Sequence, residues 1–212
     1  MFRDRKDAGQ RLGRLLERYK EKNPLVLAIP NGGARVGYEA AGHIDAEFSL
    51  IISRKLPMPD NPEAGFGAVA EDGSVYLVQE ARQWYSPDII QSTIEEQKRV
   101  IQRRITALRN GEALPDMKGR TVIVIDDGIA MGSTMRVSAG LCGKKGADRI
   151  IAAAPVSGQR TARELKKYAD EVITAEQPPD FRAVASSYED WYDVDDAEVI
   201  EIMEKYRKNS RP

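Results

Sequence analysis

The chain has 212 residues, of which 42% are hydrophobic and 31% are charged, and its formal net charge at pH 7 is −1. This is an ordinary globular composition, with room for one domain and a substantial core. The near-zero net charge argues against a dedicated nucleic-acid binder and against electrostatic membrane binding. No apolar run approaches the roughly 20 residues that a transmembrane helix needs, and the charged N-terminus leads into no signal-peptide core. We therefore expect a cytoplasmic protein with neither nucleic-acid nor membrane partners.

The chain contains a single cysteine, Cys142, and a single histidine, His43. One cysteine excludes an intrachain disulfide. A structural zinc site usually takes four Cys or His ligands, which this chain cannot supply. A Cys–His nucleophilic pair would have to use these two residues, and it is disfavoured because Cys142 falls inside a predicted buried helix.

Apolar runs of strand length alternate with segments of helical periodicity along the chain. The continuous runs at 25–29 and 121–125 suit strands that are buried on both faces, as in a parallel sheet. An Asp-Gly turn between two short apolar runs predicts a hairpin. The elements that we expect are a helix over 4–19, a strand over 25–29, a short helix around 36–41, a strand over 48–52, a loop with three prolines over 53–63, hairpin strands over 66–70 and 75–78, a helix over 87–108, a strand over 121–125, a helix over 133–145, a strand over 149–156, a helix over 159–168, a short strand over 171–174, an irregular aromatic-rich stretch over 178–192 and a helix over 195–206.

This alternation predicts an α/β domain, doubly wound around a mostly parallel sheet. We expect a single domain over residues 1–212, with its core at about 20–175. The hairpin and the long helix after it interrupt the alternation, so we interpret about 71–118 as an insertion. The proline-rich loop at 53–63 is long enough to act as a lid over a site.

The strand at 121–125 ends in two adjacent carboxylates, Asp126 and Asp127. In a doubly wound sheet, ligands bind beyond the carboxyl ends of the strands. A loop of small residues then leads into the next helix, and its members are Gly128, Ile129, Ala130, Met131, Gly132, Ser133 and Thr134. Such a loop and a helix N-terminus offer backbone N–H groups to a phosphate, whereas two carboxylates suit sugar hydroxyls or a divalent metal.

A purely structural interpretation of this pattern is also available. Aspartates at strand ends cap helices, and Gly, Ser and Thr are common in turns. That interpretation suffices for an isolated Asp-Asp-Gly. The complete pattern of apolar strand, acid pair and small-residue loop instead favours a ligand with a phosphate at one end, a vicinal diol in the middle and a metal-bound group at the other.

The segment from Val122 to Thr134 resembles the signature with which type I phosphoribosyltransferases bind phosphoribosyl pyrophosphate (PRPP). The resemblance implies that Asp126 and Asp127 bind the ribose hydroxyls, as indirect partners of Mg²⁺, and that residues 128–134 hold the 5-phosphate. Two further stretches match in order and spacing. The run Asn31-Gly32-Gly33 resembles the pyrophosphate loop of the family, and Arg54-Lys55 stands where the family commonly has a basic pair that faces the pyrophosphate. The resemblance covers about 25–156 and looks closest to a group without assigned substrates.

The resemblance also implies a reaction. Members transfer the 5-phosphoribosyl group between PRPP and a nucleobase or other nitrogen acceptor, with Mg²⁺ and release of pyrophosphate, in nucleotide and nucleoside metabolism. The reaction needs positioning and charge neutralisation rather than a covalent nucleophile. Lys55, Arg54 and Asp127 would then be the catalytic residues. Alternatively, Arg54 and Lys55 are surface side chains that are surrounded by water and take no part in catalysis.

Acceptor recognition in this family normally lies in a variable hood. The C-terminal segment at about 176–212 is the hood-like candidate, with Phe181, Tyr188 and Trp191 as side chains on which an aromatic acceptor could stack. Packing in the core or in a dimer interface explains these aromatics equally well, and Trp84 and Tyr85 are a second possibility. We expect a homodimer.

Four positions depart from patterns that are common in the family. Asn31 replaces an arginine, Met131 replaces a threonine, and Gly128 replaces a bulkier apolar residue. Ala130 stands where enzymes that use 6-oxopurines usually carry an aspartate, which argues against such an acceptor. The departures leave open a non-catalytic PRPP or nucleotide sensor on the same fold, and a different phosphosugar enzyme as a third possibility.

Overall fold

A computed structural model describes residues 1–209 of the chain. Its main sheet has five parallel strands in the order β2-β1-β6-β7-β8. The strands are β1 (Leu25–Ala28), β2 (Glu47–Leu50), β6 (Thr121–Ile125), β7 (Arg149–Val156) and β8 (Glu171–Glu176). The predicted parallel sheet of a doubly wound α/β domain is confirmed.

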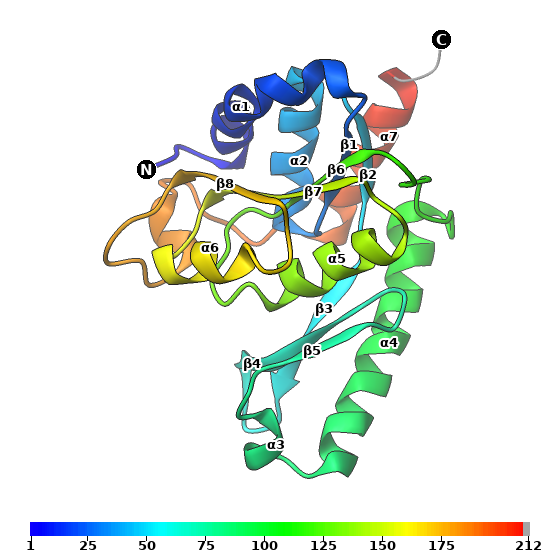
Figure 1. The fold of residues 1–212 in the computed structure, drawn as a ribbon, viewed down its shortest axis with the longest axis vertical. Helices are drawn as coiled ribbons and strands as arrows, with labels where there is room; N and C mark the ends of the chain where they lie inside the picture. Colours follow the sequence, from blue (N-terminus) through cyan, green and yellow to red (C-terminus); the bar gives the residue numbers. More distant parts are fainter. Residues whose placement is uncertain (210–212) are drawn as a thin grey trace.

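Helices cover both faces of this sheet (Figure 1). On one face lie α1 (Arg5–Leu16) and α2 (Gly32–His43), and on the other lie α5 (Ser133–Lys144) and α6 (Gln159–Leu165). Side chains that alternate along a strand point to opposite faces. In β1, Val26 and Ala28 accordingly share one core with α1 and α2, whereas Leu25 and Leu27 share the other core with α5.

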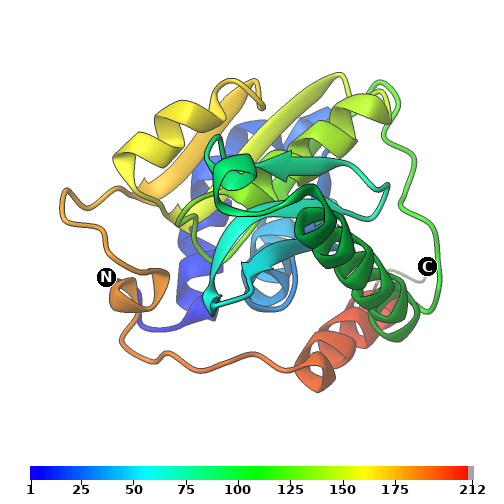
Figure 2. The same ribbon diagram turned by 90° about the horizontal axis from the view of Figure 1, so that it is seen from below.

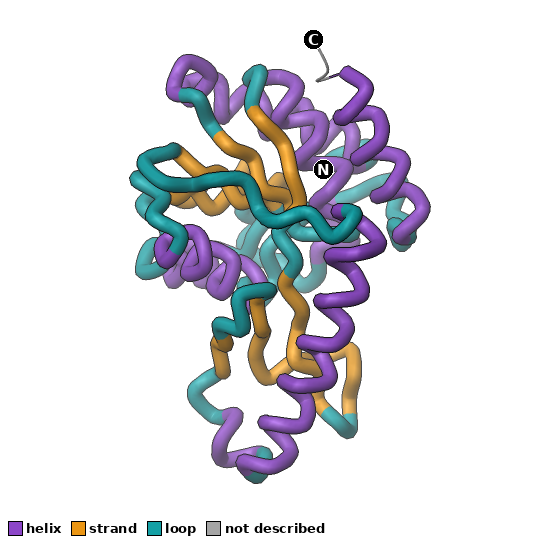
Figure 3. Tube along the Cα trace, turned by 90° about the vertical axis from the view of Figure 1, so that its right-hand side faces the viewer, coloured by secondary structure: helices purple, strands orange, loops and turns teal. Residues whose placement is uncertain are grey.

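A second, antiparallel sheet forms an arm below the main sheet (Figures 1 and 3). It consists of β3 (Ser53–Met58), β4 (Asn61–Ala70) and β5 (Val75–Leu77) in the order β3-β4-β5. Two helices complete the arm, the short α3 (Ala81–Trp84) and the long α4 (Pro87–Arg109), which runs from the tip of the arm back to the main sheet. The predicted hairpin and long helix are confirmed, although the arm begins at Ser53 rather than near residue 71.

The predicted loop over 53–63 was wrong, because most of this stretch belongs to the paired strands β3 and β4. The three prolines made the stretch look like a loop. Proline is tolerated in edge strands and at bulges, where its missing N–H is not needed for pairing. β3 is an edge strand, and its pairing with β4 is irregular on both sides of Pro57. The stretch that the sequence offered as a possible lid is therefore a β-hairpin rather than an unstructured loop.

The order of the main sheet places a topological switch point between β1 and β6. The chain passes from β1 outward to β2 on one side and continues through β6, β7 and β8 on the other. Ala28 pairs with Ile125, so the two strands end side by side. Ligands of doubly wound domains bind in the crevice that opens at such a point.

The C-terminal segment after β8 runs along the outside of the molecule and past the N-terminus (Figure 2). Its predicted irregular character is confirmed apart from a short 3-10 helix, η2 (Val184–Ser187). Phe2 holds it by accepting a hydrogen bond from the Glu189 N–H and donating one to the Ser187 carbonyl, both at 2.8 Å. The segment then crosses to the last helix, α7 (Asp196–Asn209), which packs beside α2 and α4. Within residues 1–209, no helix is both long enough and apolar enough to cross a membrane.

Candidate functional site

Asp126 and Asp127 follow β6 directly, at the switch point of the main sheet. The backbone N–H of Asp127 donates to Oδ1 of Asp126 at 2.9 Å. A cavity of about 290 Å³ opens next to the acid pair. Its lining comes from three segments, namely Lys55, Glu63, Gly65 and Gly67 of the arm, Asp126 after β6, and Gly128, Ile129, Ala130, Met131, Gly132, Ser133, Thr134 and Met135 of the small-residue loop and the start of α5.

The small-residue loop is shaped by its final glycine. Gly132 has a φ of 73°, in the left-handed region that favours glycine. It precedes α5, so Ser133 and Thr134 form the first turn of the helix, where backbone N–H groups have no partner within the helix. Both residues line the cavity. The loop is fixed from outside by the Thr161 hydroxyl, which donates to the carbonyl of Ala130 at 2.8 Å. This arrangement suits an anion, since N–H donors and a positive helix end converge on it.

The loop between β1 and α2 lies against the acid pair. A Cβ atom on Gly32 would come within 1.8 Å of Oδ2 of Asp127, and one on Gly33 would come within 3.0 Å of the Cα of Asp126. Both glycines are therefore needed for the close approach of the two loops. The sequence grouped Asn31, Gly32 and Gly33 with the acid pair, and the structure brings them together.

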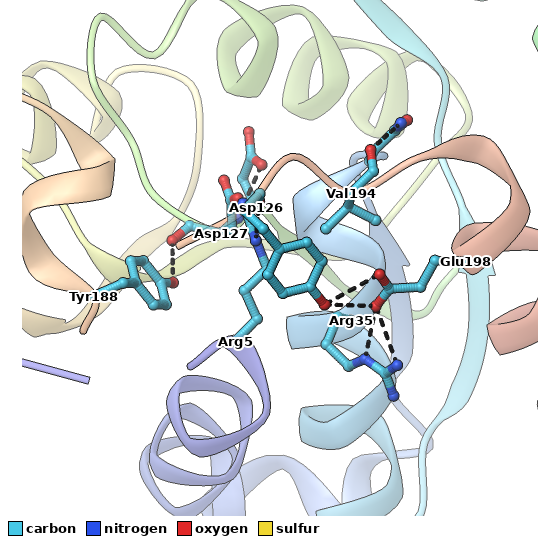
Figure 4. Close-up of polar contacts among 9 residues, drawn as sticks. Arg5, Arg35, Asp126, Asp127, Tyr188, Val194 and Glu198 are labelled. Atoms are coloured by element: carbon cyan, nitrogen blue, oxygen red, sulfur yellow. Dashed lines mark hydrogen bonds and ion pairs between the residues drawn. The ribbon is translucent and has the colours of Figure 1, made fainter. Parts of the chain in front are cut away.

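Arg5 of α1 forms a buried ion pair with Asp127 that the sequence analysis missed (Figure 4). Its Nε atom lies 2.9 Å from Oδ2 of Asp127, and the Arg5 side chain is only 4% exposed. The guanidinium also donates to the carbonyl of Tyr192 at 2.7 Å and lies 4.0 Å from the ring centroid of Trp191. Tyr188 adds a hydrogen bond of 2.6 Å from its hydroxyl to the carbonyl of Asp127. No local pattern in the sequence indicates these contacts, because they join the first helix to the last segment.

Burial makes the acid pair electrostatically unusual. Desolvation raises the pKa of Asp126 well above its ordinary range, and the neighbouring charge of Asp127 raises it further. Burial also raises the pKa of Asp127, although the Arg5 guanidinium opposes this effect. Arg5 forms its ion pair with Asp127, so Asp126 has no ion-pair partner among residues 1–209. A hydroxyl group or a metal-bound ligand beside Asp126 would relieve that cost.

We expect Asp126→Asn to stabilise the free protein at neutral pH. An aspartate with a raised pKa in the folded state holds a proton that the unfolded chain has lost, so the free energy of unfolding falls as the pH rises from 3.8 through the folded-state pKa. The asparagine variant lacks this decrease. Urea unfolding of both proteins between pH 4 and pH 8 tests the prediction. A variant with the same pH profile as the wild type would contradict it.

The structure separates Arg54 from Lys55, although the sequence grouped them. They are neighbours in β3, where successive side chains point to opposite sides. Lys55 lines the cavity and donates from Nζ to the carbonyl of Glu63 at 2.6 Å. Arg54 is not part of the cavity wall; its Nε donates to Gln97 of α4 at 3.3 Å. Only one member of the predicted basic pair therefore reaches the small-residue loop.

The candidate acceptor-stacking residues do not line this cavity either. Tyr188 is buried, with its ring 5.6 Å from that of Phe2, and Phe181 packs against the same cluster. Trp191 is exposed, and its ring lies on Arg5. Of the second pair, Trp84 is exposed, and Tyr85 packs on Phe66 in the arm. These positions show packing roles for most of the aromatics.

Two other features of the sequence find an explanation. Gly128 lies under Val184 of the C-terminal segment, where a Cβ atom would come within 2.4 Å of the valine side chain, so a bulkier residue does not fit. Cys142 is fully buried in α5, which raises the pKa of its thiol to about 12. His43 pairs with Glu17 at 2.6 Å. The disfavoured Cys–His nucleophile therefore does not form.

Comparison with known proteins agrees with these features. The phosphoribosyl transferase domain model matches residues 6–191. Two proteins of Mycobacterium tuberculosis, from strains CDC 1551 and H37Rv, carry the name phosphoribosyl transferase and are each 32% identical over 211 residues. The alignment covers 99% of this chain and 48% of theirs, so the chain spans about half the length of these curated relatives. The crystal structure of TT1426 from Thermus thermophilus is similar with a TM-score of 0.81 and 32% identity, over 97% of this chain and 99% of that one. With the acid pair and the small-residue loop inside the matched region, the chain belongs to the phosphoribosyl transferase family.

Proposed function

We propose that the chain transfers the 5-phosphoribosyl group between PRPP and a nitrogen acceptor such as a nucleobase, with release of pyrophosphate. The observation that carries the proposal is the meeting of Asp126, the small-residue loop and Lys55 around one cavity at the switch point of the sheet, with Asp127 directly beside Asp126. A ribose 5-phosphate has the matching pattern of one anionic end and a diol. Residues 128–134 would hold the 5-phosphate, and Asp126 and Asp127 would accept hydrogen bonds from the ribose hydroxyls.

The pyrophosphate of PRPP would lie toward the loop of residues 31–33. Gly32 and Gly33 begin α2, a helix of 12 residues, so that free N–H groups and the positive helix end face the anion. Lys55 would approach from the arm. This placement puts the two anionic ends of the substrate on different helix N-termini, with the ribose between them over the acid pair.

The residues present fit a magnesium ion that is held mainly by its ligand. Mg²⁺ prefers six oxygen ligands and keeps several waters. In residues 1–209, no group of three or more His, Cys, Asp and Glu side chains is arranged to hold a metal. Asp126 and Asp127 would therefore contact the metal through water or through the ribose hydroxyls. The ion would neutralise pyrophosphate charge when bound.

In the proposed reaction, the acceptor nitrogen forms a bond to the anomeric carbon while the bond from that carbon to the pyrophosphate oxygen breaks. The electron pair of the broken bond leaves with pyrophosphate, and the acceptor nitrogen releases its proton to water. Positive charge develops on the anomeric carbon while the two bonds are only partly formed and broken. The contribution of this chain would be to position both groups, to neutralise the leaving charge and to exclude water.

The proposal is tested by a turnover screen that measures pyrophosphate release from PRPP and Mg²⁺ with a panel of purine, pyrimidine and other nitrogen acceptors. Acceptor-dependent release that is abolished by chelation of Mg²⁺ supports transfer. Binding of PRPP without release for any acceptor would instead favour a non-catalytic PRPP sensor. Absence of both release and PRPP binding would contradict the proposal.

We expect Lys55→Ala to lower kcat about tenfold or more and to leave the affinity for ribose 5-phosphate within about twofold. The ammonium is a compact charge at the cavity wall, and negative charge on the leaving pyrophosphate grows toward the transition state. Lys205→Ala, at an exposed ion pair with Glu201 on α7, is the matched control and should change neither value. A loss of ribose 5-phosphate affinity at unchanged kcat would place Lys55 at the 5-phosphate instead.

A further inference from the structure

A second group of charged side chains lies beside the loop of residues 31–33, and the proposed reaction above does not use it. Arg104 of α4 has its Nη1 atom 3.0 Å from Oδ1 of Asp196, at the start of α7. Its Nη2 atom donates to Oδ1 of Asn31. The amide group of Asn31 donates in turn to the carbonyl of Val194 at 2.6 Å and to Asp196 at 3.2 Å. Arg54 of β3 lies against the same helix, because its Nε donates to Gln97 of α4 at 3.3 Å, and Gln97 precedes Arg104 by seven residues, which is two turns on the same side of the helix.

This group carries an excess of positive charge. It combines two guanidinium groups with a single carboxylate, and the side chain of that carboxylate is 46% exposed, whereas Arg104 is 14% exposed. Within residues 1–209, the hydrogen bond of the Arg54 side chain goes to the neutral amide of Gln97. Burial and the nearby charge of Arg104 both lower the pKa of Arg54. Like charges that are partly withdrawn from water are costly, and a bound anion would offset that cost.

The charged group connects directly to the acid pair. Arg104 holds Asn31, the next residue is Gly32, and Gly32 lies against the carboxylate of Asp127. The small-residue loop lies on the other side of the acid pair, between β6 and α5. An anion at Arg104 and an anion at the small-residue loop would thus lie at opposite ends of a ligand whose middle faces the carboxylates.

We propose that Arg104 is a pyrophosphate-binding residue, that Arg54 adds positive charge to the same subsite, and that Asp196 occupies Arg104 until the anion displaces it. The inference rests on the proposed function, since it assigns one end of the same substrate. A guanidinium presents a planar fork of N–H donors that matches phosphate oxygens. No pattern in the sequence indicates this role, because Arg104 is one of several charged residues in the C-terminal half of α4.

The test is calorimetric titration of the full chain with two separate probes, inorganic pyrophosphate with Mg²⁺ and ribose 5-phosphate. Arg104→Gln should weaken pyrophosphate binding about tenfold or more and leave ribose 5-phosphate binding unchanged. Arg104→Lys should recover part of the loss. Arg103→Gln, the exposed neighbour on the same helix, is the matched control and should behave as the wild type with both probes.

Asp196→Asn supplies an independent arm, because it removes the competing carboxylate and should tighten pyrophosphate binding severalfold. The inference is overturned if the wild type binds no pyrophosphate, if Arg104→Gln binds it as tightly as the wild type, or if Asp196→Asn leaves its affinity unchanged or weaker. If the wild type does not bind ribose 5-phosphate, that result would instead count against the proposed function. The two failures are therefore distinguishable by the probe that is affected.

Discussion

Asp127→Ala is expected to lower the free energy of unfolding by about 3–5 kcal/mol, the scale for removing one partner of a buried ion pair. Arg5 is only 4% exposed and Asp127 only 15% exposed, so the remaining guanidinium could not be rehydrated without opening the structure. The C-terminal segment would lose its anchor as well, since Arg5 also holds the carbonyl of Tyr192. Urea unfolding followed by circular dichroism at pH 7 measures the change.

A double-mutant cycle separates the ion pair from other losses. Arg5→Leu alone should also be costly, because it leaves the Asp127 carboxylate buried without its cation. The double variant should lose less than the sum of the two single changes. Arg11→Ala removes an exposed pair with Asp7 and is the matched control, with an expected cost below about 1 kcal/mol. A cost for Asp127→Ala no greater than for Arg11→Ala would show that the pair does not stabilise the fold.

Gly32→Ala is expected to cost about 3 kcal/mol of stability and to weaken ribose 5-phosphate binding tenfold or more, which is about 1.4 kcal/mol or more of binding free energy. The added Cβ would come within 1.8 Å of Oδ2 of Asp127 and 2.9 Å of Nε of Arg5. To accommodate it, either the ion pair must separate or the loop must leave the acid pair. Unfolding and calorimetric titration measure the two effects on one protein.

Gly42→Ala is the matched control in the same helix. A Cβ atom at Gly42 meets nothing within 4 Å. Alanine is a better helix former than glycine by up to about 1 kcal/mol, so this variant should be as stable as the wild type or slightly more stable, with unchanged binding. If Gly32→Ala behaves in the same way, the close approach of the loop to Asp127 has no energetic consequence.

The parts of the fold that could be predicted were those with a recognisable pattern of residues within one short segment. The continuous apolar runs at β1 and β6 indicated buried parallel strands, and the acid pair with its small-residue loop marked the end of β6 as a candidate site. The antiparallel strand β3 could not be found in this way. Pro57 and Pro59 suggest a loop unless the stretch is known to be an edge strand with irregular pairing.

The predicted site residues that the structure brings together come from three short segments with recognisable local patterns, namely 31–33, Lys55 and 126–134. Arg5 contacts Asp127, and Arg104 contacts Asn31, from helices whose sequences look like ordinary charged surfaces, and these contacts depend on long-range packing. Only Lys55 of the predicted basic pair lines the cavity, because adjacent strand residues point to opposite sides. The aromatics of the C-terminal segment likewise turned out to pack on Phe2 and Arg5, which the sequence had left as an open alternative.

The most direct test of the central claim is calorimetric titration of the wild type and of Asp126→Asn with ribose 5-phosphate. Asp126 is the better choice than Asp127, because its carboxylate lines the cavity and its loss does not leave Arg5 unpaired. We expect the wild type to bind ribose 5-phosphate, and the variant to bind it more weakly by about 1–3 kcal/mol, the scale for a hydrogen bond to a charged group. Equal affinity of the two proteins, or no binding to the wild type at millimolar ligand, would contradict the assignment of this cavity to a ribose 5-phosphate group.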